Sequence, residues 1–251
     1  MPKVLFSRAG DFDIATLYLS TYGTKLVQFA KDNGYEVVDL FNDDPKLPAR
    51  LLVFEAEIEK RPNLLIGLGH GNNTIFTGMD MEVLLKTGVN DDLTSGIKTY
   101  LWSCLTGVTL GPAMVEKTCP EYYGYKADWT FIYHPKYETD PLNDPYAKAF
   151  FDAGLATGYA VLLGKTPKEV YDLTIARYDY WWDYWIKQED PMADDILTWL
   201  NWNKNNFIAI TTSEIYREPV LRAGIPEFAI PLGIAGALLF LLSNSKSDAK
   251  T

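Results

Sequence analysis

Leu64-Leu65-Ile66-Gly67-Leu68-Gly69-His70-Gly71 and Lys98-Thr99-Tyr100-Leu101-Trp102-Ser103-Cys104 are the two runs that decide how this chain folds. Each run is apolar, short and rich in residues that favour strands, and each stops at a turn of small residues. The first turn carries His70 and the second carries Cys104. If both runs are parallel strands of one sheet, the two side chains emerge at its carboxyl edge, where open α/β sheets place their ligand sites.

The segments around these runs alternate between strand and helix patterns. Before them we expect a strand at 4–7, a helix from its cap Asp13 to about 31, a strand at 35–41 and a helix at 49–60. After them we expect helices at 110–117, 144–163 and 168–187, one strand or a bulged pair over 122–125 and 128–133, and a last strand at 206–211. Between the two runs, 72–78 reads as a short hairpin and 79–97 as a brief helix and a polar loop. This order predicts an α/β three-layer sandwich with a mostly parallel sheet and right-handed crossovers.

The two turn residues suit acyl-transfer chemistry. A cysteine sulfur attacks a carbonyl, and an imidazole that titrates near neutrality can take the thiol proton and give it to a leaving amine. Gly71 lets the backbone approach a substrate closely, so its N–H and that of Cys104 are candidate donors to the oxyanion. The chain has only two histidines and two cysteines, so few other pairings are available.

A strand ending in His70-Gly71, followed by one ending in Ser103-Cys104-Leu105-Thr106-Gly107, resembles the caspase-like cysteine peptidases, most of all their gingipain-like prokaryotic branch. The run from Gly107 to Glu116 and the strand at 122–125 resemble the helix and strand that follow in that branch. The resemblance covers about 60–135. It implies a caspase-like fold and a cysteine endopeptidase, with Cys104 as nucleophile, His70 as general acid and base, and Gly71 at the oxyanion site. The implied substrate is a peptide or protein, and the chemistry needs no cofactor.

Two further residues bear on substrate recognition in this resemblance. Relatives that cleave after basic residues often carry an acidic residue two positions before the cysteine, and here that position is Trp102. We therefore expect no large preference for Arg or Lys at the cleaved position. Caspases use an arginine near the first strand to bind an acidic substrate residue, which makes Arg8 a candidate. The alternative for Arg8 is an ordinary surface ion pair.

Each candidate also has a structural interpretation. A cysteine at a strand end is commonly an inert small hydrophobe, and a histidine in a turn is commonly a hydrogen-bonding group. The second hypothesis is therefore a catalytically silent caspase-like module that binds a protein partner at a membrane. His134, next to Pro135 and without a neighbouring glycine, is a weaker candidate for the base. Cys119 is expected to be dispensable.

Composition narrows the functional class. The chain has 251 residues and a net charge of −10, which argues against a nucleic-acid surface because phosphate binding needs clustered Lys and Arg. Two cysteines 15 positions apart do not form a disulfide framework and suit a reducing compartment. The N-terminus enters a strand directly and lacks the apolar stretch of a secretory signal, so we expect a cytoplasmic protein.

The chain divides into a peptidase-like domain at 1–215 and a connector with a hydrophobic tail at 216–251. Within the domain, 178–202 is rich in tryptophan, which suits helix packing or a subunit contact, or else a sugar-binding or membrane-interface surface. In the tail, 228–242 is an uncharged run of 15 residues, shorter than the roughly 17–25 of a spanning helix. It is expected either to associate with a membrane or to dock on the domain or on another subunit.

Overall fold

The computed structural model describes residues 1–10, 13–41 and 46–217. The predicted tail segment 228–242 lies outside these ranges, as does nearly all of the predicted connector. Among the described residues, none of the helices combines the length and the apolar character that crossing a membrane requires.

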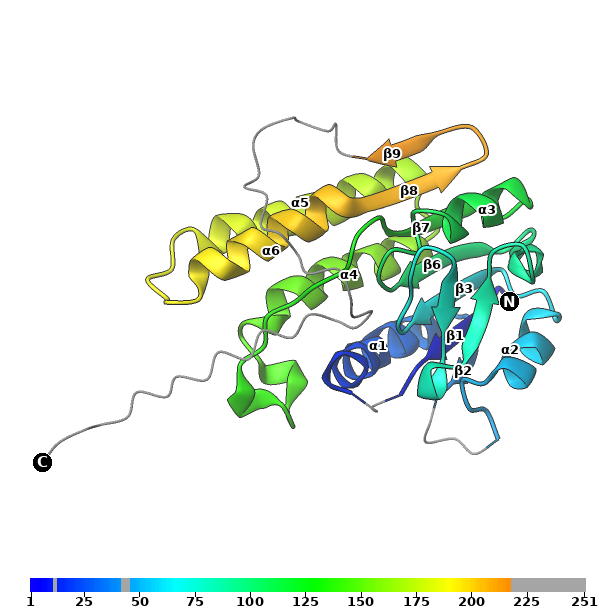
Figure 1. The fold of residues 1–251 in the computed structure, drawn as a ribbon, viewed down its shortest axis with the longest axis horizontal. Helices are drawn as coiled ribbons and strands as arrows, with labels where there is room; N and C mark the ends of the chain where they lie inside the picture. Colours follow the sequence, from blue (N-terminus) through cyan, green and yellow to red (C-terminus); the bar gives the residue numbers. More distant parts are fainter. Residues whose placement is uncertain (11–12, 42–45, 218–251) are drawn as a thin grey trace, which may run out of the picture.

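A seven-stranded sheet, in the order β2-β1-β3-β6-β7-β8-β9, forms the centre of the described chain (Figure 1). The first five of these strands run parallel, while β8 and β9 are antiparallel to their neighbours. The strands are β1 (Lys3–Arg8), β2 (Glu36–Leu40), β3 (Leu64–Leu68), β6 (Lys98–Trp102), β7 (Glu121–Tyr125), β8 (Phe207–Thr211) and β9 (Ile215–Arg217). The α/β class and the mostly parallel sheet expected from the sequence are thus confirmed.

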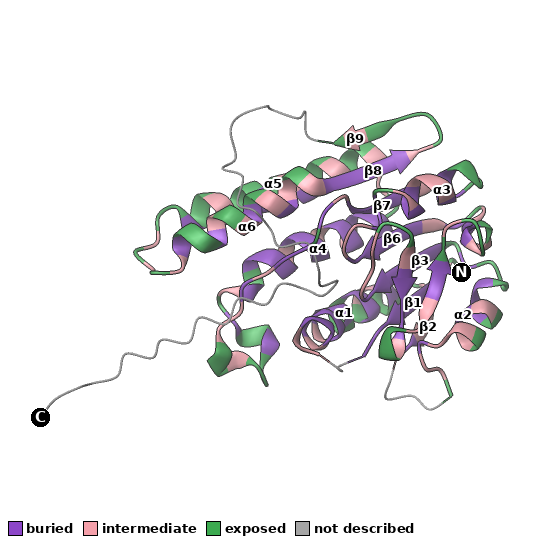
Figure 2. Cartoon of the chain, viewed as in Figure 1, coloured by how far each residue is buried: buried purple, intermediate pink, exposed green. Residues whose placement is uncertain are grey.

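Helices cover both faces of the sheet, which makes the three layers. The helices are α1 (Ile14–Asp32), α2 (Leu51–Ile58), α3 (Leu110–Glu116), α4 (Ala147–Leu162), α5 (Pro167–Trp185) and α6 (Ala193–Asn206). Alternate residues of each central strand enter two separate cores: in β1, Val4 and Phe6 pack in the core that contains α1, α4 and α5, whereas Leu5 packs in the core that contains α2 and α3. This two-sided burial is typical of parallel sheets (Figure 2).

Local sequence signals fix the starts of the two longest helices. Asp13 accepts a hydrogen bond from the Thr16 N–H, and the Thr16 hydroxyl lies within hydrogen-bonding distance of the Asp13 N–H, so α1 begins with a capping box. Thr166 and Glu169 form the same arrangement at the start of α5, with Pro167 as the first helical residue. Both starts agree with the sequence prediction.

The segment between β3 and β6 differs from the prediction. Its hairpin pairs β4 (Ile75–Thr77) with β5 (Val83–Lys86), so a strand stands where a brief helix was expected. The remaining short elements are 3-10 turns: η1 (Met79–Met81), η2 (Asp91–Thr94), η3 (Pro135–Tyr137) and η4 (Pro141–Asn143). Asp80 and Met81 both have positive φ in the hairpin turn, a conformation that the sequence pattern does not reveal.

The predicted strand at 128–133 is also wrong. This segment leaves β7 and runs past the end of the sheet, where side chains replace a neighbouring strand as hydrogen-bond partners. Asn203 of α6 accepts from the Thr130 N–H and donates to the Thr130 carbonyl, and Trp202 donates to the Asp128 carbonyl. The β-rich composition therefore reflects an extended chain held by α6, a helix that the sequence reading did not define.

Candidate functional site

Three adjoining parallel strands deliver the candidate groups to one edge of the sheet. Leu68, the last residue of β3, pairs with Trp102, the last residue of β6, so His70 and Cys104 each lie two residues beyond the paired ends. β1 lies on the other side of β3, and the chain beyond it supplies Asp13 at the start of α1. The expectation that His70 and Cys104 share the carboxyl edge is confirmed.

The loops that carry His70 and Cys104 are in direct contact through Gly71. A Cβ on Gly71 would lie 2.7 Å from Thr106 Cγ2 and 2.9 Å from the Cys104 carbonyl oxygen, so only glycine fits here without displacement. Gly71 also pairs with Phe76 of β4 as an antiparallel β-bridge. The hydrogen bonds of this bridge are made by the residues on either side of the pair, including one from the Thr77 N–H to the His70 oxygen. The N–H of Gly71 is therefore directed away from β4.

The turn after Cys104 holds a strained backbone. Leu105 has φ of +59°, in the left-handed region that a residue with a Cβ rarely adopts. Hydrogen bonds to the end of β7 and the turn after it hold it there: the Gly107 N–H donates to the Tyr125 oxygen at 2.8 Å, and the Leu105 N–H donates to the Ala127 oxygen at 3.0 Å. The position of Cys104 is thus set by β7 as well as by its own strand.

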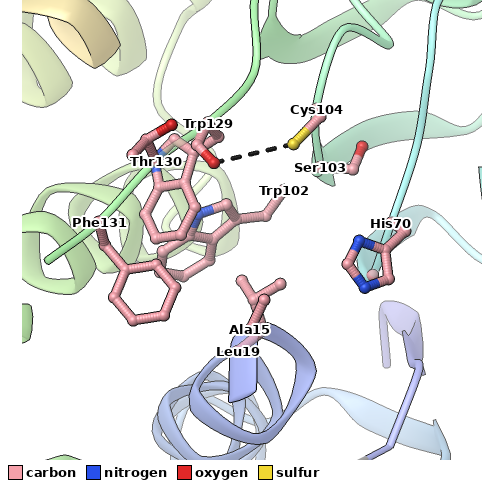
Figure 3. Close-up of a pocket in the computed structure, with 10 residues that line it drawn as sticks. Ala15, Leu19, His70, Trp102, Ser103, Cys104, Trp129, Thr130 and Phe131 are labelled. Atoms are coloured by element: carbon pink, nitrogen blue, oxygen red, sulfur yellow. Dashed lines mark hydrogen bonds between the residues drawn. The ribbon is translucent and has the colours of Figure 1, made fainter. Parts of the chain in front are cut away.

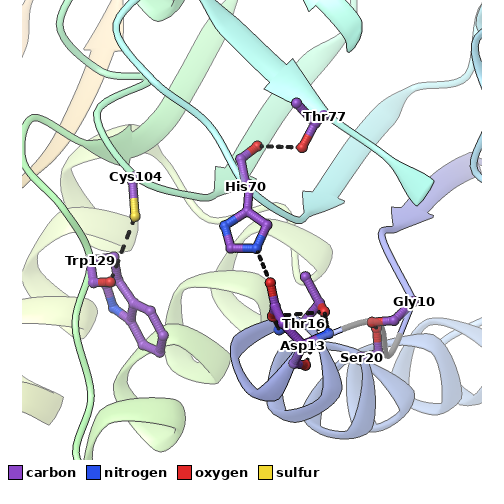
Figure 4. Close-up of polar contacts among 8 residues, drawn as sticks. All are labelled: Gly10, Asp13, Thr16, Ser20, His70, Thr77, Cys104 and Trp129. Atoms are coloured by element: carbon purple, nitrogen blue, oxygen red, sulfur yellow. Dashed lines mark hydrogen bonds and ion pairs between the residues drawn. The ribbon is translucent and has the colours of Figure 1, made fainter. Parts of the chain in front are cut away.

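His70 is oriented by a carboxylate. Its Nε2 lies 2.6 Å from Asp13 Oδ2 (Figure 4). Burial favours the neutral form of Asp13, but the hydrogen bonds from His70 and from the Thr16 N–H outweigh it and lower the pKa of Asp13 below its usual value. Because an ionised carboxylate only accepts hydrogen bonds, Nε2 carries the hydrogen, and the other ring nitrogen, Nδ1, is on the side turned toward Cys104 (Figures 3 and 4).

Sequence reasoning identified Asp13 only as a helix cap and missed its contact with His70. The signal was available, because a carboxylate just past the first strand must lie at the same sheet edge as the two turns. It was hidden because a capping box alone accounts for an aspartate at this position.

The Cys104 thiol is half-buried and protonated at rest. Its Sγ donates to the Trp129 carbonyl at 3.7 Å. Burial, together with the negative charge of Asp128, raises the pKa of the thiol to about 12. Burial also raises the pKa of Asp128, while its contact with the thiol opposes that shift. The site therefore holds its negative charge on carboxylates, Asp13 and Asp128, and not on the sulfur.

Trp102 and Arg8, the two candidates for substrate recognition, are both engaged within the fold. Trp102 is 0% exposed and packs edge-on against Trp129, with ring centroids 5.3 Å apart. Arg8 is 4% exposed; its Nε and Nη2 donate to the Asp39 carboxylate at 2.8 and 2.6 Å, and its Nη1 donates to the Ser20 carbonyl of α1. Arg8 is thus buried and joins β1 to β2 and α1 through its hydrogen bonds, so it is not available to a substrate carboxylate in this arrangement.

The second cysteine, expected to be dispensable, and the weaker histidine candidate lie away from the pair. Cys119 is 0% exposed, its thiol donates to the Ile97 and Glu121 carbonyls, and burial raises its pKa to about 11. His134 caps η3, where its Nδ1 accepts from the Lys136 N–H. Neither residue lines the pocket beside Cys104 and His70.

In the tryptophan-rich stretch, Trp181 and Trp185 lie on the buried face of α5, as the packing interpretation expects. Within the described ranges, no group of three or more His, Cys, Asp or Glu side chains is placed to hold a metal ion.

Comparison with protein-family models, with curated proteins and with solved structures finds no match for this chain.

Substitution of Asp128 by Asn tests the electrostatics of the thiol. Removing the negative charge is expected to lower the pKa of Cys104 below about 12, because the thiolate then forms without a neighbouring anion. At a fixed pH well below that value, the thiolate fraction of Cys104 rises about tenfold for each unit by which the pKa falls, and alkylation should accelerate by a smaller factor because a thiolate of lower pKa is less nucleophilic. The rate is followed by mass spectrometry in the Cys119→Ser background. Asp183→Asn, at an exposed position of α5, is the control. An unchanged or slower alkylation rate in Asp128→Asn contradicts the assigned effect of Asp128 on the thiol.

Proposed function

We propose that this chain is a cysteine endopeptidase of the caspase-like kind, with Cys104 as nucleophile and His70 as general acid and base. The observation that carries the proposal is that His70 and Cys104 leave two adjoining strands at one sheet edge and line one pocket, with Asp13 of α1 bonded to His70. A base oriented by a carboxylate, in the same pocket as a thiol, is a set of groups that nucleophilic catalysis uses.

The chemistry follows from the hydrogen-bonding roles. As Cys104 Sγ bonds to the substrate carbonyl carbon, its proton passes to His70 Nδ1, and the carbonyl oxygen becomes an oxyanion. The N–H groups of Gly71 and Cys104 are the proposed donors to that oxyanion. The proton then passes from Nδ1 to the leaving amine as the C–N bond breaks, which leaves a thioester. Water attacks the thioester with Nδ1 as base, the acid is released, and the proton returns to the sulfur.

The protonated thiol assigns a specific role to His70. With a pKa of about 12, Cys104 does not supply a standing population of thiolate at neutral pH. The proton must therefore leave during attack, so the base has to be positioned before the substrate arrives. The Asp13 hydrogen bond supplies that positioning.

The two cysteines give the first test. Cys104→Ala is expected to abolish hydrolysis of a casein or mixed-peptide substrate and labelling by peptidyl acyloxymethyl ketones, because it removes the half-buried thiol beside His70. Cys119→Ala should keep both activities, since its thiol is fully buried. Circular dichroism checks that both variants fold. Labelling that maps to Cys119, or equal loss in the two variants, refutes the assignment.

Asp13→Asn separates the charge of Asp13 from its capping role. Asn caps helices as well as Asp does, so α1 should keep its start, while the carboxylate that orients His70 is lost. We expect kcat to fall by about 10²–10⁴-fold, the usual contribution of general acid–base catalysis, with little change in KM. Thr16→Ala is the matched control, because it weakens the cap without removing the Asp13–His70 bond. A similar loss of kcat in Thr16→Ala would assign the effect to the helix start.

The alternative function is a catalytically silent module of the same fold that binds a protein partner at a membrane. The observation in its favour is the resting thiol, which bonds to the Trp129 carbonyl and has a strongly raised pKa. A folded chain that neither hydrolyses peptides nor reacts with the acyloxymethyl ketones would favour this alternative over the peptidase.

Membrane association through 228–242 is part of the proposal for either function, and it rests on the sequence alone. The run contains several large apolar side chains, each worth about 1.5–3 kcal/mol when removed from water. The full chain is expected to float with liposomes, and Leu232→Asp with Leu239→Asp should keep it in solution because burying a charge is costly. Leu52→Asp with Leu173→Asp, both exposed in the domain, is the charge-matched control. Equal flotation of all three proteins contradicts a role for this segment.

A further inference from the structure

The pocket beside Cys104 and His70 is apolar and narrow (Figure 3). Ala15 and Leu19 of α1 form one wall, Trp129 and Phe131 form the opposite wall, and Trp102 lies between them. The lining includes no Asp, Glu, Lys or Arg. A charged side chain that entered would lose most of its water among these apolar side chains, which disfavours acidic and basic residues.

The aromatic side chains leave little room. Trp129 packs against Trp102 and against Phe131, with centroid separations of 5.3 and 5.6 Å. The space that remains is about 20 Å³, which is close to what one water molecule needs. A group of the size of a methyl or hydroxymethyl fits this space, and a branched or long side chain does not.

Trp102 cannot retreat to enlarge the pocket. Its indole lies against the backbone of α4, where a Cβ on Gly154 would be 2.1 Å from Trp102 Cζ2. Its other side packs on Phe151, with ring centroids 5.5 Å apart. Since close-packed interiors resist such shifts, this boundary of the pocket is fixed by the core behind it.

From these observations we infer that the pocket receives the side chain of the residue on the acyl side of the cleaved bond and admits only a small uncharged one: Gly, Ala or Ser. This inference rests on the proposed peptidase function and names its substrate class. The carbonyl carbon attacked by Cys104 belongs to that residue, so its side chain lies next to the thiol. Trp129 and Phe131 then set specificity at the pocket, and the buried Trp102 fixes the boundary behind them.

Peptidyl acyloxymethyl ketones that differ only in the residue bearing the ketone provide the experiment, because they vary the acyl side alone. With Gly, Ala, Leu and Arg at that residue, the second-order rate of Cys104 labelling in the full chain should be at least about tenfold higher for Gly or Ala than for Leu or Arg. Phe131→Ala removes one wall and should raise the Leu-to-Ala ratio at least about tenfold. Ala15→Leu should slow the Ala probe relative to the Gly probe.

Phe29→Ala is the matched control, because Phe29 is half-buried on α1 against Tyr159 and does not line the pocket. It should leave the ratios unchanged, and Phe131→Leu repeats the test with a smaller loss of packing. Labelling of Cys104 with equal rates for all four probes, or with a preference for Leu or Arg, overturns the small-residue assignment while leaving the peptidase intact. Failure of every probe to label the folded chain overturns both.

Discussion

The parallel pairing of β3 with β6 is the constraint on which the candidate site depends. Because Leu68 and Trp102 lie opposite each other, the residues two positions beyond them leave the sheet at the same level. A slip of one residue would send each side chain of β6 to the opposite face, and Tyr100 and Trp102 would exchange cores with Leu101. Burial of both faces therefore fixes the register, and the register places His70 and Cys104 side by side at the sheet edge.

Sequence patterns predicted this part of the structure because it depends on short-range periodicity. The apolar runs, the capping residue Asp13 and the Thr166-Pro167 helix start each specify one element, and parallel topology then brings the strand ends together. The same reasoning could not assign the surroundings of a side chain. Arg8 illustrates the limit: its three hydrogen bonds go to Asp39 of β2 and Ser20 of α1, which no local pattern joins.

The segment after β7 shows a second limit. Residues 128–133 have the composition of a strand, yet the amide group of Asn203 occupies the hydrogen-bonding groups of Thr130 that a neighbouring strand would otherwise use. Strand propensity describes a preference for extended backbone, and the partner that completes it can be a side chain from a distant helix. That partner also places Trp129, whose carbonyl accepts from Cys104 and whose ring narrows the pocket.

Trp102 links the hydrophobic core to the proposed selectivity. Its indole N–H is buried without a hydrogen-bond partner among the described residues, an arrangement that costs about 1–3 kcal/mol. An apolar side chain such as Phe would fill part of the same space without that penalty. The large ring is nonetheless held on Gly154, which has no side chain to keep it away. The core therefore loses stability at this point. It holds an indole next to the cysteine at the cost of an unsatisfied N–H donor and of a glycine in a helix. In the proposed enzyme, the rigid indole fixes the size of the pocket from within, so selectivity for small residues follows from core packing.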